Sequence, residues 1–248
     1  MWVRIPPRAF SRIMPELPEV EIQVRQLRRK LRGSKILHVD VRDQKLRLPS
    51  SLIGRRIERV WRRGKFIIFD LDDDRHLLAH LRMTGWFEFR EPRRYRAAIV
   101  TSRGTAFFED SRRFGVLAVV KNLDAIHHLG PEPFADFELP TKRPVKVALL
   151  DQRLVAGIGN IYASESLWRA GIHPRRQANR LSAAEFVRLR KGIAAALRQG
   201  IGYGPRIFTM QQFAVYERVG KPCRRCGTPI RRIVQAQRST VFCPGCQH

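Results

Sequence analysis

Four cysteines near the end of the chain constrain its fold more than any other feature. They form two pairs, Cys223-Arg-Arg-Cys226 and Cys243-Pro-Gly-Cys246, with 16 residues between the pairs. This C-x2-C…C-x2-C spacing is typical of a zinc site. Four thiolates leave no coordination position for water, so we expect one structural Zn²⁺ rather than a catalytic one. Disulfides are the alternative, which the lack of a secretory signal disfavours.

The residues between the two pairs predict the shape of this metal-held element. Residues 228–242 are interpreted as a β-hairpin whose tip carries Gln237-Arg238. A rigid hairpin that presents an arginine suits insertion against a DNA groove, because a guanidinium binds phosphate and stacks on bases. The sequence contains no H-x-E signature of the zinc deaminases, which disfavours base deamination.

The charge balance favours a polyanionic partner. The 48 Lys and Arg residues outnumber the 22 Asp and Glu residues, which gives a net charge of +26. So positive a field attracts nucleic acid, and a generically basic protein is the alternative. No apolar run approaches the ~18 residues of a membrane span, so we expect none, and we expect a cytoplasmic, nucleoid-associated protein.

The first half of the chain predicts one helix followed by a sheet-forming region. Val20, Val24, Leu27 and Leu31 recur at the spacing of one helix face, and Gly33 is a natural stop. Short apolar runs separated by turn residues then favour an antiparallel sandwich or barrel. The eight predicted strands are residues 36–41, 57–61, 66–71, 77–81, 86–89, 97–101, 106–108 and 116–120.

The second half is expected to be helical. A proline-rich linker over residues 131–144 separates the halves, and helices are predicted at residues 145–150 and 161–170. The turn Gly157-Ile-Gly-Asn160 precedes the second of these helices, where free N–H groups can hold a phosphate. A capping box, Ser182-Ala-Ala-Glu185, opens a third helix that is expected to run to Gly200.

Pro15 is a candidate nucleophile if translation starts at Met14 and that methionine is removed. A terminal amine titrates near ~8 and a lysine near ~10.4, so far more of the terminal amine is neutral at neutral pH. A secondary amine that attacks a carbonyl-like carbon gives an iminium, which is covalent catalysis. In the alternative reading, Pro15 and Pro18 only restrict the backbone ahead of the helix. Residues 1–13 carry no apolar signal region and are interpreted as a misplaced start.

Several short segments stand in a fixed order along the chain. They are Met14-Pro-Glu-Leu-Pro-Glu-Val-Glu21, Asp110-Ser-Arg-Arg-Phe-Gly115, Leu129-Gly-Pro-Glu-Pro133, Leu149-Leu-Asp-Gln152, Gly157-Ile-Gly-Asn-Ile-Tyr-Ala-Ser-Glu165 and Gly171-Ile-His-Pro174. With the cysteine pairs, they resemble the formamidopyrimidine-DNA glycosylase / endonuclease VIII family of base-excision repair enzymes. The resemblance covers essentially everything after residue 13, and its first two segments are similar to the formamidopyrimidine branch.

The resemblance implies an α+β fold with three parts. An N-terminal antiparallel β-sandwich with an N-terminal helix would be followed by a helix–two-turn–helix domain and a zinc-finger β-hairpin. The implied divisions are residues 1–14 as an extension or misplaced start, 15–130 as the β-sandwich catalytic domain, 131–212 as linker and helix–two-turn–helix domain, and 213–248 as zinc finger. The implied partner is damaged double-stranded DNA, bound by a monomer.

The resemblance also implies roles for individual residues. Pro15 would attack C1′ and form the Schiff base, and Glu16 would be the acid that assists opening of the ribose ring. Lys65 would serve β-elimination and Arg238 would serve δ-elimination. The implied DNA contacts are Met83, Tyr95, Arg112, Arg113, Phe114, Lys142, Lys146 and Asn160, with Met83, Arg112 and Phe114 as the wedge that fills the vacated base stack.

Two departures from the family pattern bear on the substrate. Tyr95 stands where the family often has a histidine, and residues 201–213 are shorter than the corresponding stretch of the formamidopyrimidine branch. A truncated loop over the flipped base is therefore expected. The expected function is a bifunctional DNA glycosylase and AP lyase acting on 8-oxoguanine or formamidopyrimidine lesions. The alternatives are an oxidised-pyrimidine preference, or a catalytically silent DNA-binding protein if Pro15 stays internal.

Overall fold

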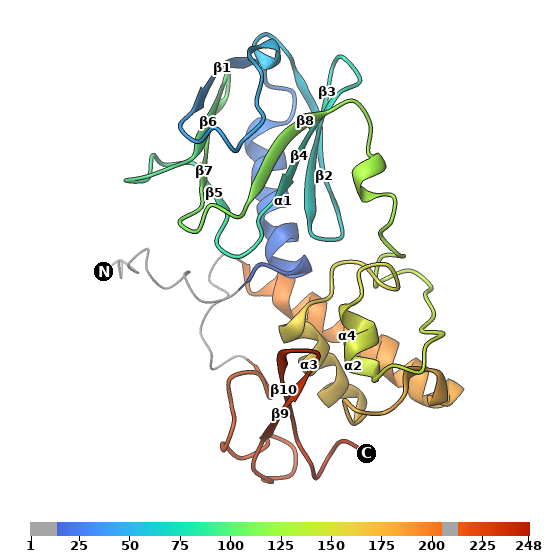
Figure 1. The fold of residues 1–248 in the computed structure, drawn as a ribbon. Helices are drawn as coiled ribbons and strands as arrows, with labels where there is room; N and C mark the ends of the chain where they lie inside the picture. The colour runs from blue at the N-terminus through green and yellow to red at the C-terminus, as the bar shows by residue number, and fades with distance from the viewer. Residues whose placement is uncertain (1–13, 205–212) are drawn as a thin grey trace. The chain divides into compact units, whose positions relative to one another are not determined.

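Two units make up the part of the chain that the computed structural model describes, residues 14–204 and 213–248 (Figure 1). Of these residues, 14–15 and 19–127 belong to the first unit, and 16–18, 128–204 and 213–248 belong to the second. The predicted misplaced start and most of the predicted truncated loop lie outside the described residues.

The first unit contains one helix and two four-stranded antiparallel sheets. One sheet has the strand order β1-β6-β7-β5 and the other has the order β2-β3-β4-β8. The helix is α1 (Leu17–Leu31), and the strands are β1 (Ile36–Val41), β2 (Ile57–Arg63), β3 (Phe66–Leu71), β4 (His76–His80), β5 (Trp86–Glu88), β6 (Ala97–Thr101), β7 (Gly104–Glu109) and β8 (Val116–Val120). The eight predicted strands and the antiparallel sandwich are confirmed. The predicted ends are off by up to two residues, because strand pairing continues past the apolar run in β2 and β7.

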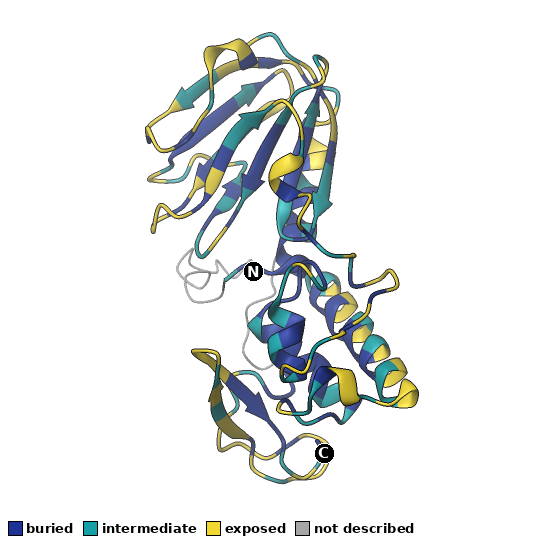
Figure 2. Ribbon diagram, turned by 45° about the vertical axis from the view of Figure 1, so that its right-hand side comes forward, coloured by how far each residue is buried: buried dark blue, intermediate teal, exposed yellow. Residues whose placement is uncertain are grey.

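The core of the first unit lies where α1 meets the two sheets. The predicted helix stripe, from Val20 to Leu31, is fully buried and packs in one cluster with inward-facing strand residues such as Phe69 and Phe108. Figure 2 shows buried, intermediate and exposed positions along the strands. In β3, every second residue, Ile67, Phe69 and Leu71, belongs to this core, which fixes the register because a slip of one residue would turn this set away from it.

Helix α1 begins at Leu17, so Pro18 lies inside its first turn rather than before it. Proline is tolerated there because the first N–H groups of a helix have no partner within the helix. The amide of Leu17 donates instead to the carbonyl oxygen of Gly157, at 3.1 Å.

The second unit is built on three helices, as predicted. They are α2 (Val145–Leu150), α3 (Asn160–Ala170) and α4 (Ala183–Gly202), and α3 packs against α4. A side chain at Gly192 of α4 would meet the carbonyl oxygen of Ser166 at 2.7 Å, so glycine permits the close approach. The predicted capping box of Ser182 and Glu185 is present at the start of α4. Three short 3-10 helices lie among the described elements. The first unit contains η2 (Ser50–Leu52) and η3 (Asp124–Ile126), and the second contains η4 (Ala178–Arg180).

The zinc-finger hairpin consists of β9 (Arg231–Gln235) and β10 (Arg238–Phe242). Its tip is Ala236-Gln237, and both residues have positive φ angles, 45° and 61°. Two such residues make the tight turn whose twist matches that of antiparallel strands. Arg238, predicted at the tip, is therefore the first residue of β10 and pairs with Gln235.

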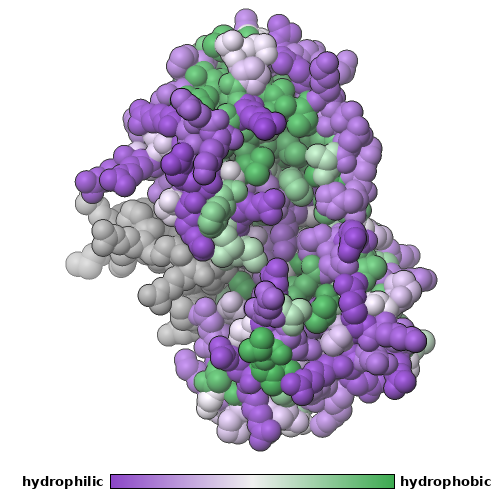
Figure 3. All heavy atoms as spheres, in the orientation of Figure 1, coloured by the Kyte–Doolittle hydropathy of each residue, from purple (hydrophilic) through white to green (hydrophobic). Residues whose placement is uncertain are grey.

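Polar side chains dominate the face of the molecule that Figure 3 shows. Within residues 14–204 and 213–248, no helix has the length and apolar character needed to cross a bilayer.

Candidate active site

Glu16 lies at the N-terminus of α3, where its carboxylate accepts three backbone hydrogen bonds. The amide of Gly159 donates to Oε2 at 2.8 Å, and that of Ile161 donates to Oε1 at 2.9 Å. The amide of Tyr162 also donates to Oε2, at 3.2 Å. The first N–H groups of a helix are free for such bonds, and the helix dipole favours an anion there. The turn that was predicted to bind a phosphate holds Glu16 in this structure.

Pro15 directly precedes Glu16 and is buried. Its nitrogen is part of the peptide bond to Met14 in this chain. Because the two candidate catalytic residues are consecutive, the bonds that fix Glu16 also restrict where Pro15 can lie.

The turn before α3 is shaped to receive this segment. Gly157 has a φ of +88°, a conformation that glycine adopts without strain. The side chain of Gln152 braces the turn: its Nε2 donates to the carbonyl oxygen of Ile158 at 2.8 Å, and its Oε1 accepts from the amide of Gly157 at 2.9 Å.

Lys146 of α2 is fully buried, and it connects α3 to the zinc-finger hairpin. Its Nζ donates to Oδ1 of Asn160 at 2.6 Å, to Oγ1 of Thr240 at 2.8 Å and to the carbonyl oxygen of Ser239 at 3.0 Å. Two of the predicted DNA contacts, Lys146 and Asn160, are thus brought together.

The charge state of Lys146 depends on its burial and on two candidate catalytic residues. Burial lowers its pKa to about 8, the carboxylate of Glu16 opposes this shift, and the guanidinium of Arg238 adds to it. Lys146 therefore interacts electrostatically with both Glu16 and Arg238, two other predicted site residues in the second unit. Arg238 itself is exposed.

Lys65 lies in the turn between β2 and β3, directly after Gly64, which has a φ of +55°. Its side chain is half-buried. Lys65 also contributes to the low pKa of His80 on β4: burial is the main cause, Arg82 and Lys65 add to it, and the pKa falls to about 3. His80 is therefore neutral at physiological pH and adds no positive charge next to Lys65.

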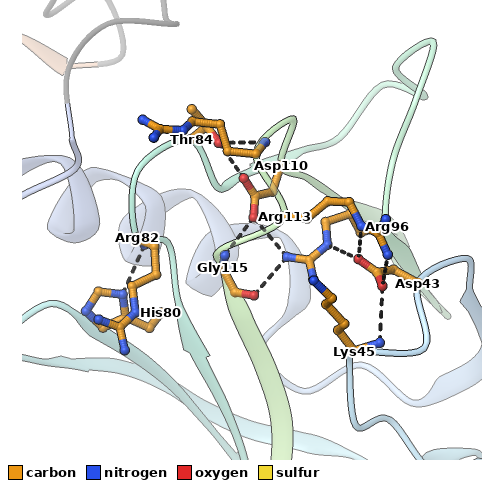
Figure 4. Close-up of polar contacts among 10 residues, drawn as sticks. Asp43, Lys45, His80, Arg82, Thr84, Arg96, Asp110, Arg113 and Gly115 are labelled. Carbon is orange, nitrogen blue, oxygen red and sulfur yellow. Dashed lines mark hydrogen bonds and ion pairs between the residues drawn. The ribbon is translucent and has the colours of Figure 1, made fainter.

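The predicted wedge is made by two loops that are tied together (Figure 4). Met83 lies in the loop between β4 and β5, and Arg112 lies in the loop between β7 and β8. The hydroxyl of Thr84 in the first loop donates to the carboxylate of Asp110 in the second, and the amide of Arg112 donates back to Thr84 Oγ1 at 3.2 Å. The structure thus brings Met83 into the same region as Arg112.

The aromatic member of the wedge is exposed. The side chain of Phe114 is 55% exposed, and the guanidinium carbon of Arg112 lies 5.0 Å from its ring centroid. An exposed aromatic ring beside a guanidinium suits insertion into a base stack, because it offers both stacking and hydrogen bonds.

A buried arginine holds the second loop in place (Figure 4). Arg96 donates from Nε to Asp43 at 2.7 Å, and from Nη1 to Asp110 at 2.8 Å and to the carbonyl oxygen of Gly115 at 2.8 Å. The amide of Gly115 closes the loop on Asp110 at 2.6 Å. A charge can be buried at low cost only if it is paired in this way.

Arg113, a predicted DNA contact, is bonded to Asp43. It donates to both carboxylate oxygens, at 2.9 Å and 2.7 Å, and its own φ is +58°. The Arg113 bond is the main reason why the pKa of Asp43 lies far below its usual value; burial acts in the opposite direction. Tyr95 lies just before β6 in the chain and donates its hydroxyl to Asp40 at 2.8 Å, with the guanidinium carbon of Arg42 3.8 Å from its ring centroid. Arg42, Tyr95, Arg96, Asp110 and Arg113 line a cavity of about 400 Å³.

Lys142, the remaining predicted DNA contact, is exposed in the linker before α2. In the second unit, the structure places it on the surface, whereas Lys146, four residues later, is buried.

Sequence reasoning missed Asp43, Arg96 and Glu165. Asp43 and Arg96 lie in no motif, and each resembles an ordinary turn residue in the sequence. Glu165 offered a signal, since it is the one acidic residue of α3. It is buried, and it accepts N–H bonds from residues 214, 215 and 216, at 2.9, 2.9 and 3.0 Å.

The four cysteines gather as predicted. Their sulfur atoms all lie within 4.8 Å of one another, with 3.4 Å between Cys226 and Cys243 and 3.8 Å between Cys223 and Cys246. A tetrahedral zinc with bonds of ~2.3 Å would separate its sulfurs by about 3.8 Å, so the cluster fits one ion. The indole N–H of Trp168 donates to Cys223 at 3.4 Å, which favours a thiolate. One structural zinc site with four cysteine ligands is therefore confirmed.

These features together define a class: a zinc-finger DNA glycosylase with a helix–two-turn–helix domain. Three family models match successive parts of the chain, and they are described as the formamidopyrimidine-DNA glycosylase N-terminal domain (residues 14–117), the formamidopyrimidine-DNA glycosylase H2TH domain (127–212) and the zinc finger found in FPG and IleRS (220–248). The chain belongs to the formamidopyrimidine-DNA glycosylase family of base-excision repair, whose members are bifunctional glycosylases and AP lyases.

Individual relatives agree with this assignment. The formamidopyrimidine-DNA glycosylase of Thermus thermophilus is 41% identical over 263 residues, which cover 94% of this chain and 98% of the relative. That of Chloroflexus aggregans is 40% identical over 273 residues, with the same coverage. The crystal structure of the MutM (Fpg) protein from Thermus thermophilus has a TM-score of 0.84 to this chain, at 40% identity, and covers 94% of this chain and 98% of its own.

Structures of more distant relatives contain damaged DNA. Lactococcus lactis Fpg in complex with DNA containing an abasic site is 32% identical, with a TM-score of 0.85, and covers 94% of this chain and all of its own. A structure of MutM with DNA containing carbocyclic 8-oxo-G is 34% identical, with a TM-score of 0.84 and the same coverage.

Proposed function

We propose that this chain excises 8-oxoguanine and formamidopyrimidine bases from damaged duplex DNA and then cleaves the strand, with Pro15 as nucleophile. The observation that carries the proposal is the position of the Glu16 carboxylate, which accepts hydrogen bonds from three N–H groups at the start of α3. Glu16 directly follows Pro15 in the chain. A nucleophile and an acid on consecutive residues need one fixed backbone geometry, and the turn at Gly157–Gly159 supplies it.

The proposed first stage is base removal. The free amine of Pro15 attacks C1′, the base leaves with the electron pair of the glycosidic bond, and opening of the sugar ring leaves an iminium between Pro15 and C1′. Glu16 is the proposed proton donor to the ring oxygen. This stage requires a protein that begins at Pro15, because the nitrogen of an internal proline carries no basic lone pair.

The proposed second stage is strand cleavage. The iminium acidifies the protons at C2′, and loss of one of them expels the 3′ phosphate by β-elimination. Lys65 serves this step, and His80, which its low pKa keeps neutral, adds no positive charge near Lys65. Arg238 at the start of β10 serves the δ-elimination that expels the 5′ phosphate, and the bonds of Lys146 to residues 239 and 240 hold that strand end.

The proposed DNA-binding residues lie in both units. In the first unit, Met83, Arg112 and Phe114 fill the stack that the damaged nucleotide vacates, and Arg113 and Tyr95 line the adjacent cavity. In the second unit, Lys142 and Asn160 contact the DNA backbone, and the buried Lys146 holds Asn160 in place. The net charge of +26 supplies the long-range attraction to DNA. We further propose that the protein acts as a monomer on the nucleoid, in the cytoplasm.

A panel of duplexes tests the substrate assignment. Each duplex carries one lesion: 8-oxoguanine, formamidopyrimidine-guanine, dihydrouracil or an intact abasic site. We expect single-turnover cleavage of the first two to exceed that of dihydrouracil by about tenfold or more. The oxidised-pyrimidine alternative has one observation in its favour, since a Lactococcus lactis Fpg structure holds DNA with an oxidised pyrimidine. Faster cleavage of dihydrouracil than of 8-oxoguanine would establish that alternative.

A further inference from the structure

A surface groove of about 290 Å³ lies in the second unit, and its lining includes none of the residues that hold Glu16. It forms between the linker at Pro133-Phe134 and one face of α4. We call it the α4 groove, and the residues that define it are Phe134, Val187, Arg190, Lys191, Ala194 and Arg198. The four α4 positions 187, 191, 194 and 198 recur at helical spacing, so they share one face, and Figure 2 shows exposed residues along α4.

Phe134 is not needed to anchor the linker. That task belongs to Phe137, which is only 5% exposed and packs its ring 5.6 Å from the ring of Phe186. The side chain of Phe134 is 42% exposed, and Val187 across the groove is 50% exposed. Apolar side chains gathered at a concave surface and rimmed by polar ones are characteristic of a binding site.

The charged side chains that line the groove are all positive. Among the described residues that line the groove, three are cationic and none is acidic. The guanidinium carbon of Arg198 lies 5.8 Å from the ring centroid of Phe134, within cation–π range. The linker itself shows which group this rim accepts, because Asp136 pairs with Arg190 while its side chain stays 90% exposed. An ion pair so exposed is weak, so an incoming carboxylate can replace it.

We propose that the α4 groove docks an acidic peptide segment of a partner protein, which places one aromatic side chain against Phe134 and its carboxylates on Arg190, Lys191 and Arg198. The groove favours a peptide over DNA because a phosphate backbone has no apolar side chain to cover Phe134 and Val187. The role is separate from catalysis, since none of the groove residues belongs to the proposed reaction or to the DNA contacts.

Fluorescence anisotropy with a defined probe tests this. The probe is a fluorescein-labelled peptide that contains six aspartates together with glycines and ends in Phe. Its matched control is the same peptide ending in Ser. We expect the Phe peptide to bind about tenfold more tightly than the Ser peptide. Phe134→Ser and Arg198→Glu should each weaken the Phe peptide by about tenfold, whereas Arg29→Glu, the same charge change at an exposed site on α1, should change binding by less than about twofold.

Four results would overturn the proposal. Equal affinity for the Phe and Ser peptides, or equal losses with Arg29→Glu and Arg198→Glu, would show attraction by net charge alone. Displacement of the peptide by an abasic-site duplex would assign the groove to DNA. Self-association of the free chain that Arg198→Glu abolishes would assign it to a second copy. If Phe134→Ser fails to fold, Arg198→Glu and the two peptides still decide, and cleavage of an abasic duplex confirms that each variant is native.

Discussion

The hydrogen atom that serves as the side chain of Gly159 decides where the Glu16 carboxyl group lies. A methyl group built on Gly159 would come within 2.5 Å of Glu16 Oε1 and 2.7 Å of Glu16 Cγ. Real contacts are never this short, so either the turn or the carboxyl group would have to move. The amide of the same residue donates to Glu16, so the backbone cannot retreat without loss of that bond.

We therefore predict that Gly159→Ala lowers single-turnover cleavage of an 8-oxoguanine duplex by about 10²-fold, the scale of a 1 Å misplacement of a catalytic group. Because DNA contacts elsewhere are unchanged, affinity for the duplex should fall far less than the rate. Gly202→Ala is the matched control, since a methyl group there meets nothing within 4 Å. Equal rates for the two variants would disprove the role of Glu16 geometry.

His80 should make the stability of the protein sensitive to mild acid. Burial lowers its folded-state pKa from 6.5 to about 3, so in that interval the unfolded chain binds a proton that the folded chain does not. Stability from this residue is complete above pH 6.5 and is lost as the pH falls towards 3. Between pH 7 and pH 5, the loss should reach about 2 kcal/mol.

Urea unfolding at these two pH values measures the effect. The difference should shrink in His80→Gln, which cannot be protonated, and should persist in His127→Gln, whose histidine is 71% exposed in the wild type. A pH dependence that His80→Gln leaves unchanged would contradict the assignment.

At the scale of elements, the loop between β7 and β8, which carries Arg112 and Phe114 of the wedge, depends on a group of buried charged residues. Arg96 and Asp43 are 6% and 4% exposed as side chains, and their ion pair also holds Arg113 of the loop. Removal of one partner from a buried pair leaves the other charge uncompensated, which typically costs about 3–5 kcal/mol.

We predict that Asp43→Asn lowers the free energy of unfolding by about 3 kcal/mol and slows insertion of the wedge, because Arg113 loses the carboxylate that fixes its left-handed backbone. Stopped-flow fluorescence of 2-aminopurine beside the lesion reports insertion separately from stability. Asp40→Asn, the same change in a pair whose side chains are 52% and 36% exposed, should cost less than about 1 kcal/mol. Similar losses in both variants would refute the buried-network interpretation.

The elements themselves were predictable where their signal is local. The α1 stripe, the eight strands, the capping box and the cysteine pairs are patterns within a few residues, and the structure contains all of them. The turn of the hairpin was misplaced by one residue, because Ala236 carries no turn signal in its sequence yet adopts a positive φ.

What the sequence could not predict are contacts between distant residues. Asp43, Arg96 and Asp110 meet only because β1, β6 and β7 pair in one sheet, and strand pairing is not visible in a single strand. The burial of Lys146 was missed for a related reason: its three acceptors come from α3 and β10, far along the chain. The resemblance to the family did supply positions for the candidate site, but their roles remain predictions.

At the scale of the whole molecule, one of the boundaries between the two units falls between Pro15 and Glu16. Pro15 belongs to the unit with the wedge loops and Lys65, and Glu16 belongs to the unit with Lys146, Arg238 and the zinc site. The proposed nucleophile is thus the residue after which the chain first enters the second unit. The proposed chemistry depends on one atom, the nitrogen of Pro15.

Reductive trapping tests that atom directly. A chain that begins at Pro15 and a chain that retains residues 1–14 are each mixed with an 8-oxoguanine duplex and sodium borohydride, which reduces an iminium to a stable amine. We predict a covalent protein–DNA adduct for the first chain only, and peptide mass mapping should place it on Pro15. An adduct of equal yield from both chains, or one mapped to Lys65, would contradict the account.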